Sequence, residues 1–406
     1  MFYTLNENVY LVEGNSRSCI YDFNTSKLYS INRALAEKLN LVNTGKLEIG
    51  DVSGETKKIF DNLIDLKILA LSENHISHYI DEIRGQDRQC DFAWIEITNR
   101  CNLRCIHCYN ESNPLADTVM SLQNYRRVID CILKLKVKRI QIIGGEPFFD
   151  KHILKQMLDY TIGKFAFIEI FTNGTLISSE WFEYLKKNDI RIALSVYSYD
   201  QNEHDKVTKC KGSWEKTNAT IEGLRNYGIQ YRVCNVLMKD VVIGGKTTDL
   251  YQLSNEKDVV RMSGRANFSL LSDELIRKKL ITKQTFQTPI NKNFCRRLLS
   301  GHNCYKEKIY VSANMEVFPC VMERRLRHCT INQDNGITLD ESIRNLNKDK
   351  IEGCKCCEYR YVCFDCRPNS LSGNLYEKPW YCTYNPILGK WEDENKFIRL
   401  IKEKWG

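Results

Sequence analysis

The placement of its cysteines constrains this chain more than any other feature of the sequence. There are 18 cysteines in 406 residues; residues 1–89 contain one of them and residues 295–382 contain ten. Thiols that pack in a core are scattered along a chain, whereas metal ligands recur at short spacings. The clustering therefore predicts bound metal, above all in the last third of the chain.

The first residues lack the basic and apolar stretches of a secretion signal, and no apolar run approaches the roughly 20 residues of a membrane span. We therefore expect a cytoplasmic protein with no membrane partner, whose thiols stay reduced. The net charge of +8 is spread over 59 basic and 51 acidic residues. Without a basic block interleaved with aromatics, this charge indicates a solvated surface and no nucleic-acid partner.

Changes of pattern along the chain predict three regions, residues 1–85, 86–290 and 291–406. In the first, three short β-prone runs precede two helical patterns, the first capped by Asn32, which suggests a small α+β module of winged-helix type. In the second, strands alternate with helices, which predicts βαβ units in a parallel sheet that curls towards a barrel. The third region has little apolar periodicity and is expected to depend on metal for its fold.

Five strands are expected in the second region, separated by helices. Their ranges are 93–98, 139–143, 165–171, 190–196 and 230–237. In parallel sheets of this kind the active site lies at the carboxyl ends of the strands, so residues directly after each strand are candidates for function.

Cys101-x3-Cys105-x2-Cys108 follows the first strand. Three thiols on one short loop can hold three irons of a [4Fe–4S] cluster, which usually takes four thiolates. The loop offers no fourth thiolate, so one iron stays open and can chelate the amino and carboxylate groups of S-adenosylmethionine (SAM). A zinc knuckle is the alternative, but structural zinc prefers recurring cysteine pairs.

The second strand ends at Gly144-Gly145-Glu146-Pro147, where glycines let the backbone approach a ligand closely. Together, this motif and the cysteine triad resemble the signature of the radical SAM superfamily, over roughly residues 92–270. The resemblance implies a partial (β/α)6-type barrel, a SAM-reactive [4Fe–4S] cluster on the triad and a low-potential electron donor such as flavodoxin or ferredoxin. The residues that it assigns to SAM binding are His107, Gly144, Gly145, Glu146, Pro147, Thr172, Asn173 and Ser195. Two departures are the segment around Ser195 and Thr208, which stands where an arginine is common.

The third region resembles the SPASM domain, which carries auxiliary iron–sulfur clusters. The resemblance implies one auxiliary [4Fe–4S] cluster on Cys295, Cys304, Cys320 and Cys366 and another on Cys354, Cys357, Cys363 and Cys382. The spacing Cys363-x2-Cys366 is one residue shorter than the family pattern, and Met315 replaces a usual glycine. The choice among Cys329, Cys354, Cys356 and Cys357 therefore stays open. A pair of zinc ribbons is the alternative.

Radical SAM enzymes with a SPASM domain mostly modify peptides or proteins, and residues 1–80 resemble the maturases of grasp-with-spasm systems. This implies an oxidoreductase that modifies a ribosomally made precursor peptide, whose leader adds as a strand to the N-terminal module, with an ATP-grasp ligase as a further partner. Thioether and carbon–carbon cross-links are the expected products, and no residue is assigned as a catalytic base. The alternatives are a sulfatase-type radical SAM oxidase, a nucleic-acid-binding winged helix fused to a redox domain and a non-catalytic iron–sulfur electron carrier.

Overall fold

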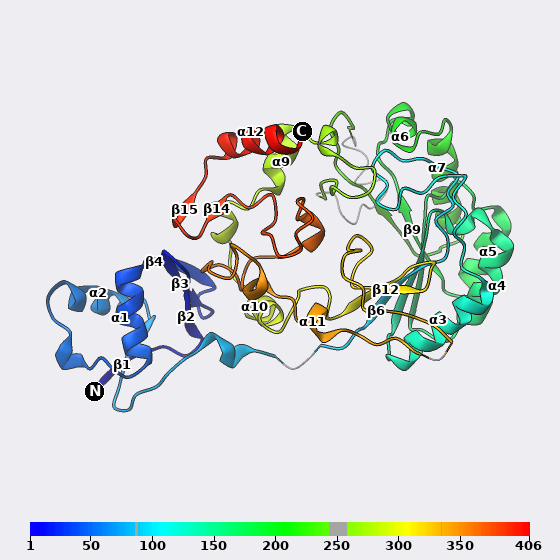
Figure 1. The fold of residues 1–406 in the computed structure, drawn as a ribbon. Coiled ribbons are helices and arrows are strands. Elements are labelled where there is room, and N and C mark those ends of the chain that lie inside the picture. Colours follow the sequence, from blue (N-terminus) through cyan, green and yellow to red (C-terminus); the bar gives the residue numbers. More distant parts are fainter. Residues whose placement is uncertain (86–87, 243–257, 334) are drawn as a thin grey trace. The chain divides into compact units, whose positions relative to one another are not determined.

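The computed structural model describes residues 1–85, 88–242, 258–333 and 335–406 (Figure 1). The chain divides into two compact units, and each joins segments that are distant in the sequence. Unit 1 comprises Met1–Asp87, Leu280–Asn303 and Asn345–Arg399; unit 2 comprises Arg88–Lys279, Cys304–Arg344 and Leu400–Gly406. The division into three consecutive regions stays a prediction.

Unit 2 contains an eight-stranded sheet in the order β10-β9-β8-β7-β6-β11-β12-β13. The strands are β6 (Phe92–Glu96), β7 (Arg139–Ile143), β8 (Phe167–Thr172), β9 (Arg191–Ser195), β10 (Tyr231–Cys234), β11 (Lys308–Val311), β12 (Glu316–Phe318) and β13 (Cys329–Thr330). Strands β10 through β11 run parallel, and β11, β12 and β13 pair antiparallel. The expected α/β architecture with a parallel sheet is confirmed.

Helices α3 (Leu122–Lys134), α4 (Lys151–Thr161), α5 (Ser179–Lys187) and α7 (Ser213–Asn226) connect these strands and cover one face of the sheet (Figure 1). The other helices in the described part of unit 2 are η3 (Pro147–Phe149), α6 (Gln201–Thr208), η4 (Phe268–Leu270), α9 (Asp273–Lys279) and α11 (Glu341–Arg344). Alternate strand residues such as Ile95, Ile142, Ile170 and Ile192 are fully buried in the core of unit 2. Because side chains alternate along a strand, the residues between them face the opposite side, where the site described below lies.

Strand β11 was not expected from the sequence. It pairs with β6 in parallel, with Lys308 opposite Phe92 and Val311 opposite Ile95. Its four residues lie within the cysteine-rich part of the chain, yet they extend the sheet beyond its first strand. A run this short gives no clear periodic signal, so only long-range pairing reveals it.

In unit 1, β2 (Val9–Glu13), β3 (Arg17–Asp22) and β4 (Lys27–Asn32) form an antiparallel sheet in that order. The other elements are β1 (Phe2–Leu5) and β5 (Leu69–Ser72), which pair with each other, α1 (Arg33–Asn43), η1 (Ile49–Asp51), α2 (Gly54–Asp65), η2 (Ile80–Ile83), η5 (Lys283–Phe286), α10 (Lys292–Leu299), η6 (Lys348–Lys350), η7 (Arg367–Asn369), β14 (Tyr384–Asn385) and β15 (Lys390–Trp391). The chain ends in α12 (Glu394–Trp405). The Asn32 side chain accepts the N–H of Leu35, which confirms the predicted helix cap.

The sheet of unit 1 is buried on both faces. Val9 and Ile20 pack against the helices α1 and α2, whereas Tyr10 and Tyr21 pack against the cysteine-rich segment that follows residue 345. The Tyr21 hydroxyl donates a hydrogen bond to the Glu358 carbonyl at 2.8 Å. The N-terminal module and the C-terminal cysteine segment therefore share one core within this unit.

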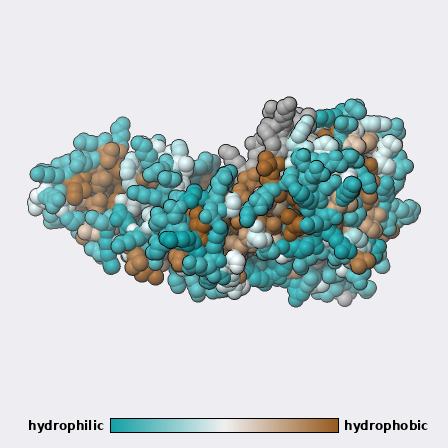
Figure 2. All heavy atoms as spheres, turned by 90° about the horizontal axis from the view of Figure 1, so that it is seen from above, coloured by the Kyte–Doolittle hydropathy of each residue, from teal (hydrophilic) through white to brown (hydrophobic). Residues whose placement is uncertain are grey.

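Hydrophilic residues cover most of the face shown in Figure 2, with hydrophobic residues gathered in a few patches. This agrees with the solvated surface expected from the mixed charge of the chain. No helix in the described part of the chain is long and apolar enough to cross a membrane.

Candidate functional site

The cysteine triad lies on the loop that follows β6 in unit 2. Its backbone is held in place by partners from α6: the N–H of Arg104 donates to the Thr208 carbonyl at 3.1 Å, and that of Ile106 donates to the Val207 carbonyl at 3.0 Å. The three triad cysteines, Cys101, Cys105 and Cys108, line one cavity of about 320 Å³ together with residues at the ends of β7, β8, β9 and β10.

The two glycines after β7 let two backbone segments come into direct contact. The N–H of Gly145 donates to the Thr98 carbonyl at 2.7 Å, and the N–H of Glu146 donates to the Arg100 carbonyl at 2.8 Å. A Cβ atom added at Gly145 would lie 2.3 Å from the Arg100 carbonyl oxygen, and one at Gly144 would lie 2.5 Å from that of Thr98. Glycine is therefore required here to support the segment that leads into the triad.

We expect Gly145→Ala to lower the free energy of unfolding by about 1–3 kcal/mol and to lower the iron content of the triad, because the added methyl group displaces the loop. Denaturant unfolding and iron analysis measure the two effects. Gly336→Ala is the matched control, since a Cβ there meets no atom of the described residues within 4 Å. Equal stability and equal iron content in the two variants would contradict the steric role of Gly145.

Glu146 is fully buried and joins the end of β7 to the end of β8. Its carboxylate accepts the N–H of Phe148 at 2.9 Å, the hydroxyl of Thr172 at 2.7 Å and the N–H of Asn173 at 2.8 Å. Burial outweighs these three hydrogen bonds and raises the pKa of Glu146 to about 7. Pro147 begins the short helix η3. Glu146 acts on the cavity by fixing the loop after β8, and neither it nor Pro147 lines the cavity.

Asn173 connects the Glu146 carboxylate to the triad. Its side-chain amide donates to the Cys101 Sγ at 3.7 Å and to the Asn102 side-chain oxygen at 2.9 Å. Thr172 and Ser195 also line the cavity. The structure thus brings the residues that follow three successive strands to the same cavity as the triad.

His107 lines the cavity between the second and third cysteines of the triad. Its ring lies edge-on to the Tyr197 ring, with centroids 4.8 Å apart. Burial, reinforced by the charge of Arg265, lowers the pKa of His107 to about 4, so the imidazole is neutral at physiological pH. Its Nδ1 is buried and has no hydrogen-bond partner among the described residues. A ligand in the cavity can supply that partner.

Arg265 is a site residue that the sequence motifs did not reveal. Its guanidinium donates to the Cys105 carbonyl at 2.9 Å and to the Ser112 carbonyl at 3.0 Å, and its N–H donates to the Cys108 carbonyl at 3.1 Å. Gly264 precedes it at φ +58°, where an added Cβ would lie 2.4 Å from the Cys108 carbonyl oxygen. The segment around residue 265 therefore fixes the curvature of the triad loop.

A second polar group lies beside the triad within unit 2. The Tyr310 hydroxyl donates to the buried Glu96 carboxylate, and the Arg324 guanidinium lies 3.6 Å from the same carboxylate and 4.0 Å from the centre of the Tyr310 ring. Burial, followed by the charge of Glu96, raises the pKa of Tyr109, the residue after the last triad cysteine. Glu96 ends β6, so this group lies where the strand leads into the triad loop.

Unit 1 brings four of the predicted auxiliary ligands together. Cys354, Cys357, Cys363 and Cys382 line one small cavity of about 20 Å³. Cys356 is not among the residues that line it, although it neighbours Cys357 in the sequence. Burial is the main cause that raises the pKa of Cys354 to about 12. The geometry thus favours Cys357 over Cys356 as a ligand.

The other predicted auxiliary set is divided between the units. Cys295 and Cys366 belong to unit 1, whereas Cys304 and Cys320 belong to unit 2, so this ligand assignment stays a prediction. Burial is the main cause of the raised pKa of Cys320, and Cys304 adds to it. No three His, Cys, Asp or Glu side chains of the described residues gather at the spacing of a single metal ion.

Comparison with known proteins agrees with this geometry. Residues 95–249 match the model of the Radical SAM superfamily. The chain contains a radical SAM domain. The chain is 38% identical over 143 residues to AlbA, the antilisterial bacteriocin subtilosin biosynthesis protein of Bacillus subtilis, a match that covers 35% of this chain and 32% of AlbA. It is 29% identical over 146 residues to the mycofactocin maturase MftC of Mycolicibacterium smegmatis, which covers 36% of each chain.

The matched radical SAM segments thus span about a third of the length of AlbA and of MftC. Among solved structures, SuiB of Streptococcus suis superposes with a TM-score of 0.56 at 15% sequence identity, covering 94% of this chain and 100% of SuiB. At this identity the similarity shows the fold alone. It confirms that the expected fold extends beyond the segment that carries the motifs.

The residues of the radical SAM domain fit an iron–sulfur cluster with bound SAM. The three thiols share one cavity wall, no further cysteine follows before Cys131, and the free Nδ1 of His107 adds a polar contact. The volume lies within the range of small-molecule pockets. Burial, with a contribution from Cys108, raises the pKa of Cys105 to about 12, so a bound iron has to displace the thiol proton.

Proposed function

We propose that this chain is a radical SAM peptide maturase, an oxidoreductase that modifies a ribosomally made precursor peptide. Cys101, Cys105 and Cys108 hold a [4Fe–4S] cluster, which together with bound SAM supplies a 5′-deoxyadenosyl radical that abstracts hydrogen from the substrate. The observation that carries the proposal is the gathering of three thiols at one cavity, at the carboxyl end of a parallel sheet, in a matched radical SAM domain.

The other residues of the cavity bind SAM and keep water out. Asn173 and Ser195 contribute polar side chains, and His107 offers its free ring nitrogen. Much of the remaining wall is apolar, made by Leu103, Ile143, Phe171, Val236, Val260 and Met322. An apolar wall protects a reactive intermediate from side reactions with water.

The N-terminal module of unit 1 supports the proposal that the substrate is a peptide. Strand β4 lies at an edge of the three-stranded sheet, and Lys27, Ser30 and Asn32 on it are exposed. Extended peptides bind to such edges by strand addition. SuiB, which shares the fold, has been solved in complex with its precursor peptide SuiA, and AlbA is named for the biosynthesis of a bacteriocin.

The proposal also covers partners and product. A donor such as flavodoxin or ferredoxin reduces the cluster on the triad, and an ATP-grasp ligase acts on the same precursor. The two further cysteine sets hold auxiliary [4Fe–4S] clusters, and the product carries a thioether or carbon–carbon cross-link. A cytoplasmic location stays a prediction. A sulfatase-type oxidase and an electron carrier without catalysis are the alternatives that the following experiment separates.

Anaerobic incubation of the reconstituted protein with SAM and dithionite is expected to yield 5′-deoxyadenosine. Peptides encoded by short open reading frames beside its gene are then added, and mass spectrometry is expected to show the loss of two hydrogen atoms per cross-link. Removal of the leader segment should prevent this loss while SAM cleavage continues. Formation of 5′-deoxyadenosine without any peptide change would overturn the peptide substrate, and no 5′-deoxyadenosine would overturn the proposed chemistry as a whole.

A further inference from the structure

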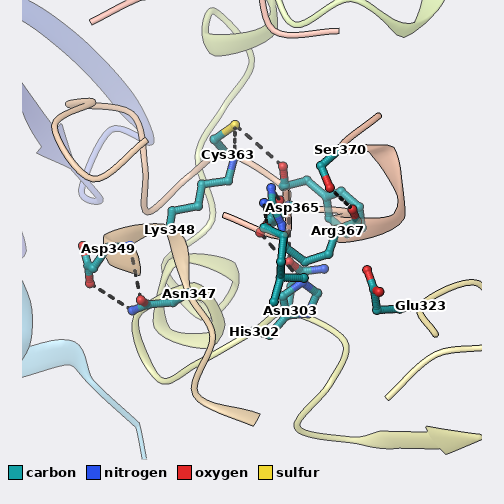
Figure 3. A network of polar contacts seen from close by, with 12 residues as sticks. His302, Asn303, Glu323, Asn347, Lys348, Asp349, Cys363, Asp365, Arg367 and Ser370 are labelled. Atoms are coloured by element: carbon teal, nitrogen blue, oxygen red, sulfur yellow. Dashed lines mark hydrogen bonds and ion pairs between the residues drawn. The ribbon is translucent and has the colours of Figure 1, made fainter. Parts of the chain in front are cut away.

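A buried lysine contacts one of the auxiliary cysteines of unit 1. Lys348 begins the short helix η6 and is only 4% exposed, and its ammonium donates a hydrogen bond to the Cys363 Sγ at 2.9 Å (Figure 3). Lysine is almost never buried to this extent without a partner, because removing its charge from water is costly. The pairing with Cys363 therefore calls for an explanation beyond packing.

The cavity of the auxiliary set gives that explanation. Lys348 lines the same cavity as Cys354, Cys357, Cys363 and Cys382. A neutral thiol balances the charge of an ammonium poorly, whereas a thiolate that binds iron carries the negative charge and the acceptor strength that the ammonium needs. The contact is thus the arrangement expected once Cys363 is a metal ligand.

The buried carboxylate of Asp365, whose charge acts on Lys348, is already paired with another cation. Asp365 is 2% exposed and forms an ion pair with the fully buried Arg367 (Figure 3). Arg367 also donates to the carbonyls of Leu375 at 2.9 Å and Glu377 at 2.7 Å. The positive charge of Arg367 therefore balances the negative charge of Asp365. Lys348 contributes a net positive charge at the cavity wall.

We propose that Lys348 acts through Cys363 to raise the reduction potential of the auxiliary cluster held in unit 1. This inference rests on the proposed function, which places a cluster on these four cysteines. Reduction adds one electron to a cluster, and a hydrogen bond and a positive charge at a ligand sulfur stabilise the reduced state. The effect is large where water is excluded, because charges interact more strongly at low dielectric.

The test uses the full chain with Cys101, Cys105 and Cys108 replaced by alanine, so that the auxiliary clusters alone remain. Redox titration followed by electron paramagnetic resonance is compared for this protein with and without Lys348→Met, which keeps an unbranched side chain and removes the charge. We expect one couple to move to lower potential by at least about tenfold in its reduction equilibrium, ~59 mV for a one-electron couple. Lys350→Met is the matched control, since Lys350 lies two residues away and is exposed.

An unchanged potential in a Lys348→Met protein with full iron content would overturn the role of Lys348. A triad-free protein that binds no iron would instead overturn the auxiliary cluster itself, so the two failures are distinguishable. If Lys348→Met does not retain iron, the unsubstituted lysine is tested in protein labelled with ¹⁵N at the lysine side chains. A hyperfine coupling between a lysine nitrogen and the reduced cluster is then expected, and its absence overturns the inference.

Discussion

Simultaneous replacement of Cys101, Cys105 and Cys108 by alanine is expected to lower the rate of 5′-deoxyadenosine formation at least about a thousandfold, to the level of the reagents alone. Among the described residues, four cysteines line the cavity: these three and Cys234, which ends β10. The three are the cysteines that lie together on the loop after β6. Without them no open iron is available to bind SAM. Anaerobic incubation with SAM and dithionite, followed by chromatography, measures the effect.

The same variant is expected to keep the iron of the auxiliary sets, falling from about twelve to about eight irons per chain, since each [4Fe–4S] cluster holds four. Cys210→Ala is the control, because Cys210 lies outside all three predicted ligand sets and does not line the cavity. It should leave both iron content and SAM cleavage unchanged. A triad variant that still forms 5′-deoxyadenosine at the original rate would refute the assignment of these cysteines.

The features that the sequence predicted well are local. Alternating apolar runs and helical patterns predicted the parallel strands β6 to β10, and Asn32 was recognised as a helix cap from its position before an apolar run. The triad and the glycine pair were found because each is a short motif directly after a strand. In all of these cases the physical cause lies within a few residues of the feature itself.

The features that the sequence did not predict depend on contacts between distant residues. Arg265 fixes the triad loop from 160 positions away, and Tyr310 reaches Glu96 across 214 positions. The residues around Lys348 in the sequence are mostly polar and charged, as on a protein surface. Only the fold buries Lys348 against Cys363. No periodicity or spacing marks such residues, because their role is set by the topology of the chain.

The glycine pair shows how the structure changes the explanation of a sequence motif. The sequence suggested that Gly144 and Gly145 let the backbone approach a ligand. In the structure, the atoms closest to their missing side chains are the carbonyl oxygens of Thr98 and Arg100. The motif therefore supports the triad loop directly, and Glu146 extends this support to the loop after β8.

The second large effect is expected where the fold depends most on metal. Between residues 345 and 391, unit 1 contains only one-turn helices and two-residue strands, with Lys348 and Arg367 buried among them. If the cluster is lost, Cys363 no longer carries the charge of an iron-bound thiolate, and the Lys348 ammonium is left buried without a matched anion. Breaking such a buried pair costs about 3–5 kcal/mol. We therefore expect Cys357→Ala to lose about four irons per chain and to speed amide hydrogen exchange in this segment at least about 100-fold.

Hydrogen exchange followed by mass spectrometry measures the exchange rate of each peptide segment, and iron analysis measures the iron content per chain. Cys356→Ala provides the control within one residue, since Cys356 does not line the auxiliary cavity and is expected to change neither quantity. The strands β6 to β9 of unit 2 serve as an internal reference, because their core is apolar and contains none of these ligands. If Cys356→Ala and Cys357→Ala behaved alike, or if removing all iron with a chelator left the protection of this segment intact, metal would not be what stabilises it. A selective effect of Cys357→Ala would instead show that the folding of the cysteine segment depends on the auxiliary cluster. The same would then hold for the sheet that shares its core through Tyr10 and Tyr21.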